Sequence, residues 1–192
     1  MTRRIVLFSV FALLLGNAPA FPTSIVPPTF EELVDGATTI FVGETVSRRS
    51  QRLESRDGPL IVTLVTFNVV ETLKGAPGLQ MTLEFMGGTV GELTLVVSGM
   101  PQFNVGDKDV VFVGRSTSAV SPLVGFAYGR FRISKDDQTG RESVRTYDGR
   151  NFASTTSMGF VNREFPRADT LSLSTFKTDV VRRVRVAAQP AR

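Results

Sequence analysis

The sequence predicts a mostly β protein, a five- or six-stranded barrel with a short N-terminal helix and a C-terminal amphipathic helix. Three observations support this class. Residues 60–75 (LIVTLVTFNVVETLKG) alternate at the strand period of two, and residues 79–85 repeat that alternation. Residues 29–34 and 173–184 carry helical signals instead. A chain of 192 residues is long enough for one ordinary domain that buries its own core.

The N-terminus has the order of regions that is typical of a secretory signal peptide. Arg3 and Arg4 precede a 12-residue apolar run, and Ala18-Pro19-Ala20 supplies small residues at a cleavage point. That run is shorter than the roughly 20 residues that a membrane-spanning helix needs, so we expect no stable membrane anchor after cleavage and a periplasmic or secreted product. The predicted organisation is a signal peptide over 1–20, an extended lead-in over 21–28, one domain over 29–186 and a tail over 187–192.

The first helix is predicted from Thr29 and Glu32, which have the spacing of a capping box. A first strand is expected over 38–48, followed by a polar loop over 47–58 that contains four arginines. We interpret this loop as a solvated hairpin tip, with a binding surface as the alternative. In the next strand, the alternation fails after Val69, as a β-bulge would produce.

The second half of the chain predicts further strands and one helix. Phe103 is expected to plug the barrel end, and Leu173, Phe176, Val180 and Val184 form one helical stripe. The remaining expected segments are strands over 79–85, 90–97, 110–113, 124–134 and 142–147, a hairpin loop over 136–140, and a long surface loop over 148–168.

The composition excludes several kinds of chemistry. The chain has no cysteine and no histidine, so disulfides, Ser-His-Asp triads, Cys-His pairs and nearly all zinc sites are excluded. We therefore expect no cofactor, no metal site and no catalytic residues. A pair of carboxylates, the minimum for a glycosidase, is the remaining catalytic possibility.

The charge balance bears on the class of partner. Removal of residues 1–20, which hold two arginines and no acid, changes the balance to 20 basic and 18 acidic residues, or +2 in place of +4. Nucleic-acid binders carry a concentrated basic face, and here the basic residues of the C-terminal helix have a simpler role against the helix dipole. We expect a protein or envelope polymer as partner, and no nucleic acid.

The order of elements over 30–115 resembles the OB-fold barrel of the netrin-module and tissue-inhibitor-of-metalloproteinase family. Three stretches carry the resemblance: ATTIFVGETV at 37–46, VTFNVVETLKG at 65–75 and FNVGDKDVVFVG at 103–114. The resemblance implies an OB-like barrel that serves as a protein-binding platform. The inhibitors of that family chelate a protease zinc through an N-terminal Cys. This chain has none, so inhibition by chelation is not implied.

The candidate binding surface lies between residues 87 and 103 (GGTVGELTLVVSGMPQF). Its proposed members are the flexible or adaptable residues Gly87, Gly88, Gly99, Met100 and Pro101. If they bind a partner, Met100 and Pro101 should be at least partly exposed at a barrel end. The alternative is that these glycines simply form hairpin turns at the two ends of a core strand.

These patterns favour a non-catalytic exported binding module for a protein or an envelope polymer. Two alternatives stay open at this point. One is a carboxylate-based hydrolase of a cell-envelope or extracellular substrate, which needs two acids with raised pKa in one cleft. The other is a purely structural envelope protein.

Overall fold

The structure, a computed structural model, describes residues 26–55, 58–115, 120–158 and 170–189. It is mostly β, with one six-stranded antiparallel sheet, a separate two-stranded sheet and helices near both ends of the described chain. The expected signal peptide lies outside the described residues. In chain order the elements are α2 (Phe30–Gly36), β1 (Ala37–Ser55), β2 (Gly58–Lys74), β3 (Gln80–Met86), β4 (Gly88–Val90), β5 (Leu93–Leu95), β6 (Lys108–Gly114), β7 (Arg130–Lys135), β8 (Glu142–Thr146), the 3₁₀ turn η1 (Thr155–Ser157) and α3 (Leu173–Ala187).

The main sheet has the strand order β3-β2-β1-β6-β7-β8 and is open. We expected an OB-like barrel of five or six strands, but β3 and β8 are the two edges of this sheet, and no pairing joins them in the described part of the chain. Instead, the outer edge of β8 is covered by later segments of the same chain. Its Val144 N–H donates to the Leu171 carbonyl at 3.0 Å, and Arg145 forms a bridge with Asn151. Since β8 already has these partners, it is not free to close onto β3.

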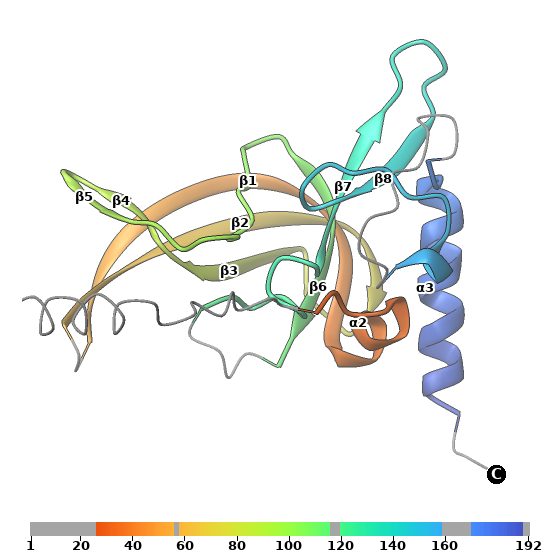
Figure 1. The fold of residues 1–192 in the computed structure, drawn as a ribbon, viewed down its shortest axis with the longest axis horizontal. Helices are drawn as coiled ribbons and strands as arrows, with labels where there is room; N and C mark the ends of the chain where they lie inside the picture. Colours follow the sequence, from red (N-terminus) through yellow and green to blue (C-terminus); the bar gives the residue numbers. More distant parts are fainter. Residues whose placement is uncertain (1–25, 56–57, 116–119, 159–169, 190–192) are drawn as a thin grey trace, which may run out of the picture.

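Strands β1 and β2 form one long, curved hairpin that runs the length of the molecule (Figure 1). The polar run expected as a loop over 47–58 is strand as far as Ser55, so that prediction was wrong. Ser55 pairs with Gly58, and the arginine-rich residues before it pair with the apolar start of β2. The complete backbone ladder that β2 offers outweighs the polar composition of this segment.

Three register shifts bend this hairpin. On β2, Val70 and Leu73 are extra residues relative to β1, and on β1 Val46 is extra relative to β2. The shift at Val70 confirms the bulge expected after Val69. Gly43 lies beside it, where a Cβ would come within 2.6 Å of the Phe41 ring. The bulges increase the local twist, and they move later side chains to the other face of the sheet.

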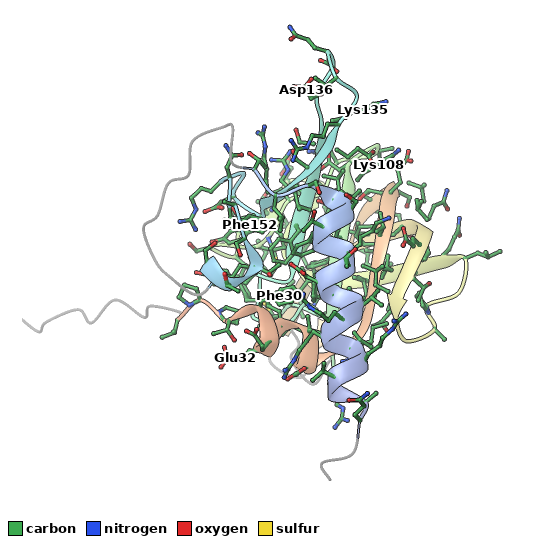
Figure 2. All side chains as sticks on the ribbon, turned by 90° about the vertical axis from the view of Figure 1, so that its right-hand side faces the viewer. Phe30, Glu32, Lys108, Lys135, Asp136 and Phe152 are labelled. Atoms are coloured by element: carbon green, nitrogen blue, oxygen red, sulfur yellow. The ribbon has the colours of Figure 1, made fainter. Side chains whose placement is uncertain are left out.

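The sheet therefore has a core on each face. The first core lies under α2 and α3, where Phe176 of α3 packs against Phe131 with ring centroids 4.9 Å apart. Phe30 and Phe152 lie beside α3 and complete this aromatic cluster (Figure 2). The second core lies on the face without helices. Its buried members are Phe41, Val65, Phe67, Leu83, Phe85, Phe103, Val111, Val113 and Leu123.

Both helices begin as their sequences predict. The Glu32 N–H donates to Thr29 Oγ1 at 3.2 Å, and the Thr29 N–H donates to the Glu32 carboxylate at 2.8 Å, which completes the capping box. On α3, Leu173, Phe176 and Val180 are buried, as the stripe predicts. None of the helices in the described ranges is long and apolar enough to cross a membrane.

Ion pairs connect α3 to neighbouring elements. The Arg183 guanidinium pairs with Asp35 at the end of α2, and it holds the pKa of that carboxyl below its ordinary value. Lys177 pairs with Glu71 of β2 at 2.6 Å. These exposed pairs add little to the stability individually, and the buried side chains of α3 hold the helix against the sheet.

Two predicted strands are shorter than expected. The segment 90–97 contributes only to the small hairpin β4–β5, and Leu93 is 52% exposed. The strand over 124–134 begins only at Arg130, because Gly125 and Phe126 have φ of 64° and 68°. Strands do not tolerate this left-handed backbone, so the chain turns here.

Truncation of Phe67 should test the assignment of the second core. Phe67 is fully buried, while its neighbour Asn68 on the other face is exposed. We expect Phe67→Ala to lower the free energy of unfolding by about 3–5 kcal/mol because it leaves a cavity, and Asn68→Ala by under about 1 kcal/mol. Denaturant titration measures both values. Equal losses at the two positions would refute this face assignment.

Candidate functional site

A cavity of about 190 Å³ opens on the face of the sheet that carries no helix. Its floor is apolar and belongs to the second core, with Val65, Phe85 and Phe103 each about 2% exposed. The β4–β5 hairpin and the chain that follows it form the wall. In Figure 1 this hairpin and α3 lie at opposite ends of the molecule. The cavity reaches solvent at exposed residues of this wall, among them Val96, which is 82% exposed.

Four of the five residues proposed from the sequence line this cavity: Gly87, Gly88, Met100 and Pro101. The fifth, Gly99, lies just outside it, where a Cβ would be 3.5 Å from the Phe126 ring. The segment proposed from the sequence thus lines a cavity, and its binding role stays a prediction. The roles of the individual residues differ from those proposed.

Gly87 and Gly88 serve the fold of their own chain. Their φ angles are 102° and 130°, and a Cβ on Gly88 would clash with the hydroxyls of Ser50 and Thr63. Thr63 Oγ1 donates to the Gly87 carbonyl at 2.7 Å, and the Gly87 N–H donates to the Ile61 carbonyl at 2.8 Å. The glycines let the chain cross closely over the β1–β2 hairpin, and this crossing builds the cavity wall.

Met100 and Pro101 differ in exposure. Met100 is half-buried and packs against the second core, which agrees with the expectation. Pro101 is buried, so the expectation of exposure was wrong for this residue. Pro101 is buried because Phe103, two residues later, is packed in the second core. The Phe103 ring lies 5.2 Å from those of both Phe67 and Phe85, and it draws the preceding residues inward.

Beneath the cavity wall lies a buried charge cluster that the sequence analysis missed. Arg130 is 2% exposed and Asp109 is fully buried. The Arg130 Nε donates to Asp109 Oδ1 at 2.8 Å and its Nη2 to Asp109 Oδ2 at 3.1 Å, a bidentate pair. Nη2 also donates to Asp107 at 2.9 Å. The clue in the sequence was an acid at the start of a buried apolar strand, where a charge requires a partner.

The cluster fixes the shape of the cavity. The Arg130 guanidinium lies over the Phe103 ring, with its central carbon 4.1 Å from the ring centroid, and Nη1 donates to the Gln102 carbonyl. Burial raises the pKa of Asp109, and the hydrogen bonds from Arg130 oppose that rise. Arg130 therefore holds both the side chain and the backbone of the segment that walls the cavity.

Arg48 lies at the cavity on the β1 side. Its Nη1 donates to the Phe103 carbonyl at 3.4 Å, and it is the only charged residue among the described residues that line the cavity. The side chain is largely exposed. The sequence analysis placed Arg48 where the strand expected over 38–48 overlaps the loop expected over 47–58, and its position beside the segment 87–103 was not foreseen.

The described ranges contain no group of three or more acidic residues placed to hold a metal ion. The closest pair of acids in the cluster, Asp107 and Asp109, shares the guanidinium of Arg130. This arrangement is typical of a structural ion pair. Comparison of the chain with protein-family models, with curated proteins and with solved structures finds no match.

Loss of the Asp109 carboxylate should destabilise the protein strongly. Asp109→Asn leaves the Arg130 charge buried with a weaker set of partners, so we expect the free energy of unfolding to fall by about 3 kcal/mol. Asp137→Asn, on the exposed β7–β8 loop, is the matched control and should change it by under about 0.5 kcal/mol. Urea titration near pH 7 compares the two. If Asp109→Asn leaves the free energy of unfolding almost unchanged, the pair of Asp109 and Arg130 does not stabilise the fold.

Proposed function

We propose that this protein is a non-catalytic exported module that binds a partner protein at the cavity of residues 85–103. The observation that carries the proposal is the size and lining of this cavity. About 190 Å³ is below the roughly 300–1,000 Å³ of most small-molecule sites. It exceeds the cavity of about 150 Å³ that holds benzene in another protein. A site of this size suits one apolar side chain of a partner.

The surroundings of the cavity support a protein partner over an envelope polymer. Val96, which lines the cavity, is 82% exposed, and Leu93 of the adjoining β5 is 52% exposed. Protein interfaces place an apolar anchor in a pocket and surround it with such contacts, whereas a polysaccharide requires many polar groups. Arg130 holds the wall before any partner arrives, and a preformed pocket lowers the cost of ordering on binding.

The expected relation to the netrin module belongs to this proposal. The sheet is open, but it is strongly bent, and an OB-fold is itself a partly open barrel. The proposed binding role agrees with the protein-binding habit that this resemblance implies. Export is proposed from the order of regions in residues 1–20. The engagement of Asp107 and Asp109 by Arg130 favours a binding module over a carboxylate hydrolase.

A charged substitution at the rim should abolish capture of the partner without unfolding the protein. The bait is immobilised mature protein, and the material is an envelope extract of the source cells. We expect Val96→Asp to lose a protein that the wild type retains, because it places a carboxylate in the apolar contact. The thermal midpoint should stay within a few degrees, since Val96 is exposed.

Val70→Asp is the matched control, because Val70 is 64% exposed on β2 but does not line the cavity. It should retain the same protein as the wild type, identified by mass spectrometry of the bound fraction. The proposal fails if both variants retain it, if both lose it, or if the wild type retains only a polysaccharide.

A further inference from the structure

Arg48 makes the cavity more selective than its apolar floor alone would. Its guanidinium donates to the Phe103 carbonyl at the wall, yet Arg48 forms no ion pair among the described residues. By contrast Arg52, four positions along the same strand, pairs with Glu54 at 3.0 Å. A ligand carboxylate could form a charge-assisted pair with Arg48. The cavity therefore combines one cation with an apolar floor.

The volume restricts how far apart the two ligand groups can lie. A space of about 190 Å³ holds one side chain, so the carboxylate that reaches Arg48 must belong to the same residue or to one beside it. In an extended peptide, successive side chains point to opposite sides, and residues two apart are separated by roughly 7 Å. If an apolar side chain of the peptide fills the cavity, an acidic residue next to it would point away from Arg48. An acidic residue two positions along the peptide would lie too far from the cavity. A C-terminal carboxylate is attached to the same Cα as the final side chain, and it satisfies the restriction.

We propose that the cavity binds the C-terminus of a partner polypeptide whose last residue is apolar, with its carboxylate on Arg48 and its side chain on the floor of Val65, Phe85 and Phe103. Capture of a C-terminal carboxylate is an established mode of peptide recognition. This inference rests on the proposed function, because it names the part of the partner that enters the site. It assigns Arg48 as the residue that determines specificity.

The test is fluorescence anisotropy with the mature protein and a labelled hexapeptide, Gly-Ser-Gly-Ser-Thr-Leu, that carries fluorescein at its N-terminus. We expect the free acid to bind at least about tenfold more tightly than the C-terminal amide, since a hydrogen-bonded charge pair is lost in the amide. The same peptide ending in Ser should also bind at least about tenfold more weakly, because it leaves the floor uncovered.

Two arginine variants show whether the carboxylate acts through Arg48. In Arg48→Ala the affinity for the free acid should fall to that for the amide, so that the difference between the two peptides disappears. Arg49→Ala is the matched control, because Arg49 is exposed on the opposite face of β1 and does not line the cavity. It should keep the full difference. Arg48→Lys should retain part of it, since a lysine supplies charge without the bidentate geometry.

Several outcomes would overturn the inference. These are equal binding of acid and amide, an undiminished difference in Arg48→Ala, or complete displacement of the peptide by equimolar decanoic acid, which would indicate a lipid-like ligand. Absence of any peptide binding while Val96→Asp still loses the captured protein would overturn this inference and leave the proposed function standing. If no peptide binds and the capture experiment also fails to distinguish Val96→Asp from the wild type, both proposals are refuted.

Discussion

The long ladder between β1 and β2 is the constraint on which the rest of the structure depends. The part of the ladder where the start of β1 pairs with the end of β2 is covered on both faces. The helices lie on one face and the second core on the other. The far part of the ladder extends beyond β6, where β1 has no second sheet neighbour in the described chain. The bulge at Val46 lies just where β1 leaves β6, while those at Val70 and Leu73 lie within the part that is covered on both faces. Each bulge shifts the register and bends the strands. The cavity lies at the part of the β1–β2 hairpin that extends beyond β6, beside Arg48 and Thr63.

The buried pair of Arg130 and Asp109 connects the core of the sheet to the cavity. A buried ion pair is costly to desolvate, and its contribution to stability is often close to zero. Here the pair holds the Arg130 guanidinium where it contacts Gln102 and Phe103. The guanidinium has a carboxylate on one side, the Phe103 ring on its face and a backbone carbonyl at a third point. An apolar residue at this position could fill the space, but it could not hold the segment of Gln102 and Phe103 in a single arrangement.

The glycines of the candidate site illustrate how one sequence pattern supports two explanations. Gly87 and Gly88 were proposed as points of close approach to a partner. The close approach exists, but it is to Ser50 and Thr63 of the same chain. The binding capacity that we propose lies in what this crossing creates, a cavity with an apolar floor next to Arg48, which forms no ion pair with any described residue. The glycines contribute by allowing the crossing, and the side chains around them contribute the recognition.

The sequence by itself determined the features that depend on neighbours within a few residues. The capping box of Thr29 and Glu32, the stripe of α3 and the alternation of β2 and β3 could be predicted because caps and periodicity are local. The composition also singled out residues 87–103, a segment that lines the cavity proposed as the site. Only the tertiary structure decided the open strand order, the extension of β1 to Ser55, and the meeting of Arg48 with the segment 87–103. These features depend on pairings between distant residues, such as Arg130 with Asp109, 21 positions apart, and local patterns do not specify which distant segment becomes the neighbour.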